Sequence, residues 1–325
     1  MIRRLRLRPR PAAQIKHMAT HAASVFVPSR AVLRLRKGRD RVIELGLLLA
    51  ALVAVFTTLS IVFVLVYESV PFFEHVPLRD FLTDTMWTPL FAEARYGILP
   101  LVAGTLVTTF VALGVAIPAG TIIAIYLSEF APFRLRETIK PCLELLGAVP
   151  TVVYGYFALL MVTPFLQKFF PELPGFNMLS AGLVIGIMII PYIASVSEDA
   201  MRAVPNYMRE GSYAMGATRF QTATRVVLPA ALSGIAAAYI LGISRAVGET
   251  MVVAVAAGLQ PNLTWNPTEP AATITAFIVQ VSLGDLPHDS IGYQSIFAAG
   301  LVLMLMTLVF NIAGFTLTRR FRETY

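Results

Sequence analysis

Six long apolar segments that contain no Asp, Glu, Lys or Arg constrain this chain more than any other feature of its sequence. A helix needs about 20 predominantly apolar residues to cross the hydrocarbon core of a bilayer. The segments lie at residues 45–67, 97–128, 145–167, 173–197, 226–244 and 290–318. The sequence leaves two possible C-terminal ends for the fifth segment. It ends at Ser244, or it continues past Arg245 and Glu249 to about Gln260. The sequence therefore predicts an all-α membrane protein with six transmembrane helices.

Charged residues are too few to cover the water-facing surface of soluble domains. They make up 14% of the chain, against 57% hydrophobic residues, whereas a soluble domain has about 25% charged residues. The apolar segments also lack the alternation of apolar and polar residues that marks the strands of a membrane β-barrel. The net charge of +7 does not indicate a nucleic-acid-binding protein, because the surplus is confined to residues 1–44, which hold 12 Lys or Arg against 2 Asp or Glu.

The distribution of Lys and Arg predicts which ends of the helices face the cytoplasm. Cytoplasmic segments of membrane proteins carry an excess of these residues. With a cytoplasmic N-terminus, 22 Lys or Arg fall on the cytoplasmic side and 3 on the other side. The cytoplasmic segments are then 1–44, 128–142, 198–225 and 319–325. We therefore expect both the N-terminus and the C-terminus in the cytoplasm.

The N-terminal segment 1–44 is strongly basic. Its first 39 residues contain no acidic residue, which fits either a transit peptide or a disordered cytoplasmic tail held near anionic lipid. We favour the tail. Because the first apolar run begins only at Leu45 and is long enough to span a bilayer, we expect no cleavable signal peptide. The sequence does not decide whether translation starts at Met1 or at Met18.

The sequence lacks the groups that an intramembrane enzyme needs. The four histidines lie outside the apolar segments, so none is placed to activate a serine within a span. No cluster of carboxylates and histidines suits a metal ion, and the single cysteine, Cys142, excludes an intrachain disulfide. The G-x-x-x-x-G-K-[ST] loop that binds ATP phosphates is also absent. We therefore expect no enzymatic site, metal or cofactor in this chain.

The cytoplasmic segment between the fourth and fifth apolar segments has a specific spacing. It reads as a short amphipathic helix that contains Glu210, a break at Gly216, and a second helical piece that closes with V-V-L-P at Pro229. This spacing resembles the EAA loop of ABC importer permeases, in which E-A-A, three residues, G and nine residues precede I-x-L-P. Gly211 and Ser212 stand where that pattern has two alanines, and both are small enough for close helix packing.

The resemblance implies a function for the segment 198–225. In this family the loop forms a coupling helix that sits in a groove of a cytoplasmic ATPase subunit. The resemblance therefore assigns coupling to the ATPase to Glu210, Gly211, Ser212, Gly216 and Pro229. The alternative from the residues alone is an ordinary loop at the membrane interface.

Two charged residues follow the fifth apolar segment, in the stretch G-I-S-R-A-V-G-E-T-M. Arg245 and Glu249 are four residues apart, so they would lie on one face of a continuous helix. Each charge near the bilayer centre costs about 2.5–3.5 kcal/mol on insertion scales, and we expect this face to meet protein or a water-filled path. Two interpretations remain: an ion pair that holds helices together, or an anion site in which Glu249 moderates Arg245. The guanidinium suits phosphate or sulfate, because its planar fork matches two oxygens.

The same stretch is similar to the G-R-A-x-G-E-T stretch in the membrane subunits of phosphate-specific ABC importers, in particular the C subunit. Ser244 stands where that subunit often has glycine. The motif E-L-L-G-A-V-P-T-V-V-Y-G, which begins at Glu144, and the motif I-M-I-I-P-Y-I-A, which begins at Ile187, extend the similarity. It runs from about Gly97 to Phe315, and the first 44 residues take no part in it.

The resemblance implies the type I ABC importer permease fold. It divides the chain into a basic cytoplasmic tail at 1–44, a first transmembrane helix at 45–67 and a permease domain at 97–318. It also implies a multi-pass protein of a bacterial inner (plasma) membrane whose Arg245 and Glu249 line the substrate path.

The implied partners are a related six-helix subunit, two cytoplasmic ATPase subunits that hydrolyse the ATP, and an extracytoplasmic phosphate-binding protein. Three alternatives stay open: the A subunit of the same importer, a permease for sulfate, molybdate or phosphonate, and an anion channel or ion-coupled carrier.

Overall fold

The computed structural model describes residues 30–91, 93–287 and 290–320. The chain divides into two compact units, Met1–Ile61 and Val62–Tyr325, which are treated separately below. Within the described residues, the regular elements are helices, apart from an isolated antiparallel bridge between Trp87 and Tyr96. The prediction of an all-α protein is therefore confirmed.

The described part of the first unit, residues 30–61, is one helical segment. It belongs to α2, Arg30–His75, which contains the predicted first span 45–67 and is long and apolar enough to cross a membrane. The prediction that residues 30–44 belong to a disordered tail is wrong, because they are helical. Arg, Leu and Lys favour helix, and no proline interrupts this stretch, so the helix extends beyond the apolar run. The rest of the predicted tail, residues 1–29, lies outside the described residues.

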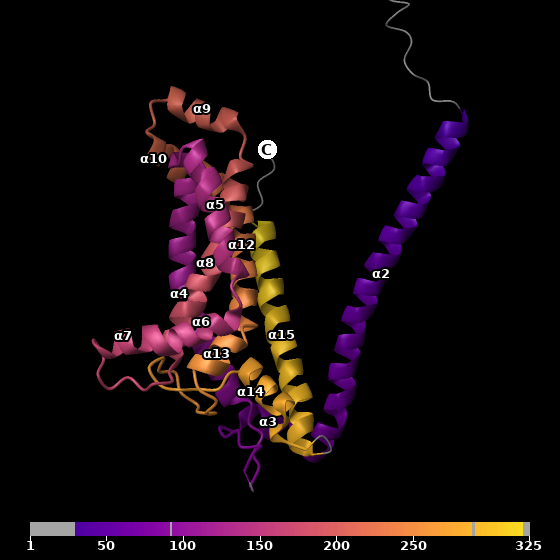
Figure 1. Ribbon diagram of the computed structural model, residues 1–325, viewed down its shortest axis with the longest axis vertical. Helices are drawn as coiled ribbons and strands as arrows, with labels where there is room; N and C mark the ends of the chain where they lie inside the picture. Colours follow the sequence, from indigo (N-terminus) through magenta and orange to yellow (C-terminus); the bar gives the residue numbers. More distant parts are fainter. Residues whose placement is uncertain (1–29, 92, 288–289, 321–325) are drawn as a thin grey trace, which may run out of the picture. The chain divides into compact units, whose positions relative to one another are not determined.

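The centre of the second unit is α8, Met178–Arg202, most of which is buried. The main helices around it are α4 (Leu99–Ile125), α5 (Phe133–Ala148), α12 (Leu232–Val247) and α15 (Ile291–Arg320). Of these, α8 packs against α4, α5 and α12, and α15 packs against α12 (Figure 1). Small residues allow α4 and α8 to approach closely, since a Cβ added to Gly186 would lie 2.7 Å from the Ala112 carbonyl oxygen.

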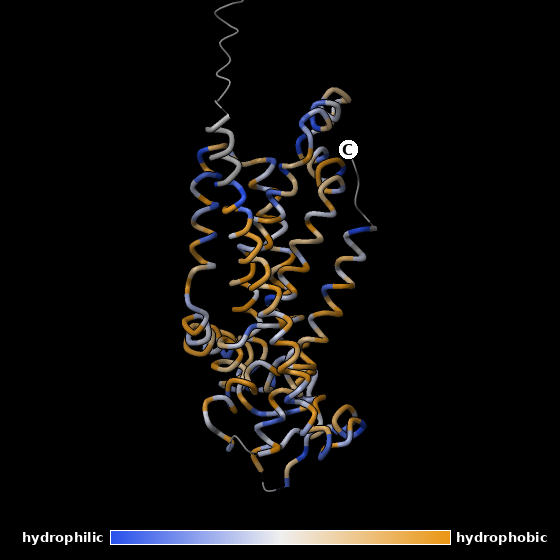
Figure 2. The backbone as a smooth tube through the Cα atoms, turned by 90° about the vertical axis from the view of Figure 1, so that its right-hand side faces the viewer, coloured by the Kyte–Doolittle hydropathy of each residue, from blue (hydrophilic) through white to orange (hydrophobic). Residues whose placement is uncertain are grey.

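Different elements occupy the two ends of the second unit. At one end lie α3 (Leu78–Thr83) and α14 (Ile274–Gln280), which continues into the π-helical turn η4 (Val281–Asp285). At the opposite end lie α9 (Asn206–Ala214) and α10 (Arg219–Thr222), and α15 ends toward that side (Figure 1). Hydrophobic residues predominate along the middle of the bundle and hydrophilic residues gather toward its ends, as Figure 2 shows.

An aromatic cluster closes the end opposite α9. Trp87 is fully buried and meets the Phe277 ring edge-on, with ring centroids 4.9 Å apart. Phe72, near the C-terminus of α2, packs edge-on against Phe81 and Tyr96. Edge-to-face aromatic pairs contribute about 0.5–1.5 kcal/mol each beyond the burial of their surface. The cluster therefore ties the last turns of α2 to the loop before α4 and to α14.

The predicted third span, 145–167, is not one continuous helix. Its residues are divided between α5 and a second helix, Thr151–Gln167, and the two are bent by 87°. The second helix comprises α6 (Thr151–Phe157), η2 (Ala158–Val162) and α7 (Thr163–Gln167). Pro150 explains the break, because a proline excludes the preceding residue from helical geometry, and Val149 is extended with ψ 132°.

The predicted fifth span, 226–244, is also broken. The helix Arg219–Ala230 meets α12 at a bend of 73°. That helix comprises α10, η3 (Ala223–Val227) and α11 (Leu228–Ala230). Sharp bends occur at prolines and π-helical turns, and both precede this one. Pro229 therefore lies two residues before the bend at Ala231.

The continuation of the fifth span to Gln260 is wrong as well. α12 ends at Val247, and a separate short helix, α13 (Met251–Ala256), follows. Gly248 ends α12 with φ −86° and ψ 0°. The described residues contain four uninterrupted helices that are long and apolar enough to span a membrane, or six spans if each bent pair counts as one.

Candidate functional site

The segment between α8 and α12 folds as the sequence predicts, as a helix, a glycine break and a second helix. α9 carries Glu210, Gly211 and Ser212, and the first two are exposed. The Ser212 hydroxyl lies 2.9 Å from the Thr222 hydroxyl and hydrogen-bonds to it, which ties α9 to α10. Gly216 reverses the chain with φ 82°, a left-handed conformation that favours glycine.

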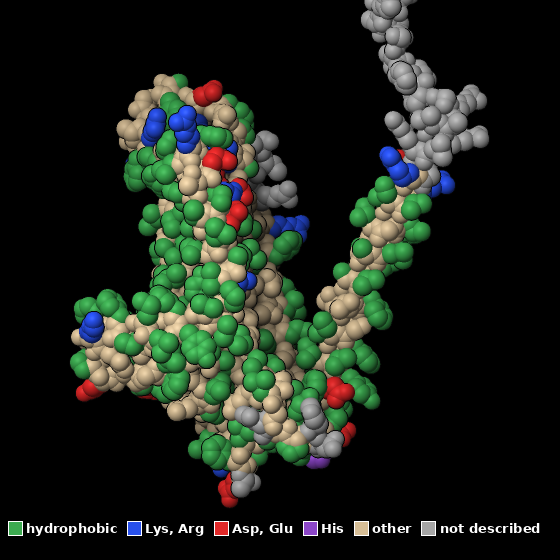
Figure 3. Space-filling view, in the orientation of Figure 1, with side chains coloured by type: hydrophobic (Ala, Val, Ile, Leu, Met, Phe, Trp, Pro, Cys, Tyr) green, Lys and Arg blue, Asp and Glu red, His purple; other side chains and the backbone are tan. Residues whose placement is uncertain are grey.

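Large apolar side chains remain exposed on α9, on α10 and in the turn between them. Met215 is 88% exposed, and Tyr207 and Phe220 are each more than 60% exposed. Charged side chains gather around the same end of the second unit, in contrast to the apolar surface along the bundle (Figure 3). Clustered exposed apolar groups on a polar end are typical of protein-binding surfaces.

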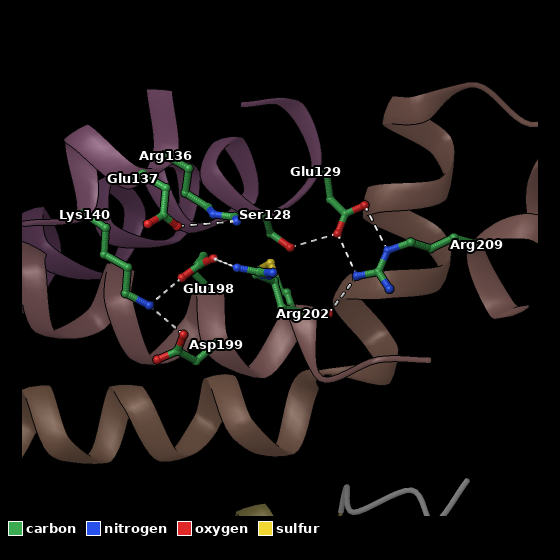
Figure 4. A network of polar contacts seen from close by, with 10 residues as sticks. Ser128, Glu129, Arg136, Glu137, Lys140, Glu198, Asp199, Arg202 and Arg209 are labelled. Carbon is green, nitrogen blue, oxygen red and sulfur yellow. Dashed lines mark hydrogen bonds and ion pairs between the residues drawn. The ribbon is translucent and has the colours of Figure 1, made fainter. Parts of the chain in front are cut away.

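Arg209 connects α9 to two other helices. Its guanidinium donates two hydrogen bonds to Glu129, from Nη2 to Oε1 at 2.9 Å and from Nε to Oε2 at 3.3 Å (Figure 4). It also donates to the carbonyl oxygens of Val204 at 2.6 Å and Met201 at 2.8 Å, at the C-terminal end of α8. Glu129 lies in the π-helical turn η1 (Tyr126–Phe130), which continues α4.

A second charge network joins α5 to α8. The Lys140 ammonium donates to Glu198 at 2.8 Å and to Asp199 at 2.6 Å. The Glu198 side chain is completely buried, and its other oxygen lies 3.6 Å from the Arg202 guanidinium (Figure 4). Lys140 and Arg209 are therefore each paired with a buried carboxylate of another helix.

Arg245 is placed differently. Its guanidinium carbon lies 4.3 Å from the centroid of the Tyr192 ring, which is a cation–π contact between α12 and α8. Its Nε is buried without a hydrogen-bond partner. Among the described residues, no carboxylate lies within 4.0 Å of Arg245, whereas the arginines and lysines of Figure 4 all have such partners.

Glu249 does not share a helix with Arg245. The expectation that the two lie on one continuous helix face is wrong, because α12 ends at Val247 and Glu249 follows the break. The Glu249 side chain is buried and accepts a hydrogen bond from the Val252 N–H at 3.4 Å, in the first turn of α13. Its main-chain oxygen accepts a hydrogen bond from the Thr275 hydroxyl at 2.7 Å.

A hollow of about 370 Å³ lies beside Tyr192. Its lining comes from the C-terminal part of α5 and the middle of α8, namely Glu144, Gly147, Ala148, Pro191, Tyr192, Ser195 and Val196. The Tyr192 hydroxyl donates to the Gly147 carbonyl oxygen at 3.3 Å. Tyr192 therefore contacts both Arg245 and the end of α5, next to the bend at Pro150.

The described residues contain no group of three or more His, Cys, Asp or Glu that could hold a metal ion. The charged groups that the structure places in this region include the Arg245 guanidinium and the buried Glu249 carboxylate.

Comparison with known proteins decides the family. The model of the family described as "Binding-protein-dependent transport system inner membrane component" matches residues 116–323. The chain belongs to this family. As a member whose apolar helices are long enough to span, this permease is a multi-pass protein of the inner membrane.

Curated relatives cover most of the permease. The "Probable ABC transporter permease protein YqgH" of Bacillus subtilis is 36% identical over 71% of this chain and 74% of the relative. The "Phosphate transport system permease protein PstC" of Mesorhizobium japonicum is 34% identical over 74% of this chain and 78% of the relative. The "Phosphate transport system permease protein PstC 1" of Mycobacterium tuberculosis is 34% identical over 75% of this chain and 82% of the relative.

Solved structures show that the permease has the type I ABC importer fold. A bacterial alginate ABC transporter, in complex with an alginate pentasaccharide-bound periplasmic protein, matches with a TM-score of 0.62. The match covers 88% of this chain and 97% of that chain, at 18% identity. An inward facing MetNI methionine ABC transporter matches with a TM-score of 0.51 over 70% of this chain and 95% of that chain, at 21% identity.

Sequence reasoning missed the residues that hold the permease together at the α9 end. Glu129 and Arg209 are 80 positions apart, and Lys140 and Glu198 are 58 apart. Glu129 and Glu198 directly follow apolar segments, but nothing in the sequence pointed to their partners. Tyr192 stood within a motif that was noted, but nothing in its spacing pointed to Arg245.

Proposed function

We propose that this permease is a membrane subunit of an ATP-driven phosphate importer and forms the translocation path with a related six-helix subunit. The observation that carries the proposal is the free guanidinium of Arg245 in a chain similar to named phosphate transport permeases over about three quarters of its length. An intramembrane arginine without a carboxylate partner needs a compensating anion, and here the transported ion supplies it.

The contact with Tyr192 orients this guanidinium. The ring covers one face of the planar group at 4.3 Å, so the N–H donors that point outward in the plane stay available. Those donors match two oxygens of a phosphate. Glu249 would act from the neighbouring break between α12 and α13, where a carboxylate limits how tightly the anion is held. Both residues are proposed to line the substrate path.

The α9 end would be the ATPase-binding end. Its exposed apolar side chains and the coupling residues Glu210, Gly211, Ser212, Gly216 and Pro229 support a coupling helix that docks on a cytoplasmic ATPase. Two such ATPase subunits would hydrolyse the ATP, and this chain would supply no catalytic group. Both termini are then cytoplasmic, and an extracytoplasmic phosphate-binding protein would deliver the anion at the α3 and α14 end.

ATP-dependent uptake into membrane vesicles tests the proposal. Wild-type transporter should accumulate labelled phosphate, and excess unlabelled phosphate should compete far better than sulfate or molybdate. Arg245→Gln should abolish uptake at matched protein level, while Arg134→Gln, a control at an exposed arginine of α5, should keep it. Preferential competition by sulfate would reassign the substrate, and uptake that persists without ATP would indicate a channel or carrier.

A further inference from the structure

We infer that the Arg209–Glu129 pair transmits movement of α9 into the spanning helices, so that Arg209 is a positioning residue for coupling ATP hydrolysis to transport. This inference rests on the proposed function, because it takes α9 to be the helix that the ATPase moves.

The geometry of the pair joins three elements through one side chain. Arg209 belongs to α9, Glu129 to the end of the α4–η1 helix, and the two carbonyl oxygens that Arg209 also binds to the C-terminal end of α8. Ser128 donates a further hydrogen bond to Glu129 at 2.8 Å, which fixes the carboxylate. A displacement of α9 therefore acts on α4 and α8 together (Figure 4).

The pair is buried enough to act as a firm contact. The Glu129 side chain is 5% exposed and the Arg209 side chain 14% exposed. Four hydrogen bonds hold the planar guanidinium in one orientation. A lysine ammonium acts as a point charge and would not fix the position of α9 in the same way. The carbonyls at the end of α8 also carry the negative end of that helix dipole, which favours a cation.

The remaining attachments of α9 are weak. The helix has no buried residue. Met208 packs partly against a small apolar cluster, and Ser212 bonds to Thr222 within the same cytoplasmic segment. In the part of the chain that the structure describes, the Arg209–Glu129 pair is the one ion pair or side-chain hydrogen bond between α9 and the α4–η1 helix. Removing it would let α9 move without α4.

The experiment uses the complete transporter in proteoliposomes, with its second membrane subunit, ATPase subunits and binding protein, and measures phosphate import and ATP hydrolysis together. In Arg209→Lys, ATP hydrolysis should stay within about two-fold of wild type, while phosphate imported per ATP falls at least tenfold. The phosphate concentration for half-maximal import should not change, since the pair is outside the path. Arg134→Gln, at an exposed arginine of α5, is the matched control and should behave as wild type.

A cross-link keeps the inference testable if the lysine variant assembles poorly. Glu129→Cys and Arg209→Cys, combined with Cys142→Ala, allow the two positions to be joined by a reducible bis-maleimide. The link should restore most of the phosphate imported per ATP, and its reduction should remove that gain. Import per ATP at the wild-type value in Arg209→Lys, or no gain on cross-linking, would overturn the inference. If wild-type transporter imports no phosphate, the proposed function itself fails.

Discussion

The charges at the α9 end and the arginine at the end of α12 are held in opposite ways. At the α9 end, Lys140 and Arg209 each meet a buried carboxylate on another helix. Arg245 instead lies on an aromatic ring, and no carboxylate among the described residues comes within 4.0 Å. A buried ion pair fixes the relative position of two helices, whereas an arginine held only by a ring keeps its donors for a ligand. The same residue type thus has a structural role in one region and, under the proposed function, a binding role in the other.

Breaking a pair at the α9 end should have the largest effect on stability. Glu198 is fully buried, and Glu198→Gln leaves Lys140 with Asp199 alone. We expect a loss of about 3 kcal/mol, the lower end of the range for a broken buried pair, because one partner remains. Thermal unfolding of the purified protein in detergent measures it.

Asp199 provides the matched control, because it binds the same ammonium but its side chain is 64% exposed. Asp199→Asn should cost less than about 1 kcal/mol, as exposed pairs do. If both variants lose the same free energy of unfolding, the burial of Glu198 does not make its ion pair more stabilising than that of Asp199.

Changing the ring beneath Arg245 should affect transport more than stability. Tyr192→Leu removes the cation–π contact, which contributes about 0.5–2 kcal/mol, and should raise the phosphate concentration for half-maximal uptake by about tenfold. Tyr192→Phe keeps the ring face and loses only the 3.3 Å hydrogen bond to Gly147, so it should stay within about two-fold of wild type. Uptake curves at matched protein levels check this. If phenylalanine and leucine behave alike, the ring does not orient the arginine.

The smallest effect separates two glycines of the segment 198–225, the proposed coupling segment. A Cβ at Gly211 or Gly216 meets no atom within 4 Å, but only Gly216 has a positive φ. Gly216→Ala should therefore lower stability by about 1–2 kcal/mol, the cost of a left-handed residue, whereas Gly211→Ala should be neutral or slightly stabilising.

A bulky substitution at Gly216 tests the coupling role of this segment directly. A bulky change, Gly216→Trp, should uncouple transport while membrane insertion stays intact. Normal phosphate uptake together with wild-type recovery of the ATPase in a pull-down would argue against ATPase docking at this segment.

The positions of the helices could be predicted from the sequence, but the bends within the spans could not. Runs without charge located the four uninterrupted spanning helices and the two bent pairs of the described residues, because the cost of burying charge in lipid is a local property of the sequence. Hydropathy carries no information on the angle of a bend, so the third and fifth segments were predicted as continuous spans. The glycine break in the coupling segment was predicted correctly, since Gly216 alone permits the turn.

The contacts of the charged residues could not be predicted for the same reason, because they depend on where helices end and how they pack. Arg245 and Glu249 were expected on one helix face because the helix was assumed to continue, and the end of α12 at Val247 removes that geometry. The pair of Glu129 and Arg209 depends on how α4, α8 and α9 pack, which a single sequence does not reveal.

Phosphate uptake by the double variant Arg245→Gln/Glu249→Gln tests the central claim, that Arg245 is kept for the anion and not for Glu249. Uptake is measured in vesicles at matched protein levels, beside both single variants and Arg134→Gln. If Arg245 binds the transported anion, the double variant transports no better than Arg245→Gln alone, even where it folds well. Near-normal uptake by the double variant would show that the two charges serve only each other, and would contradict the anion site.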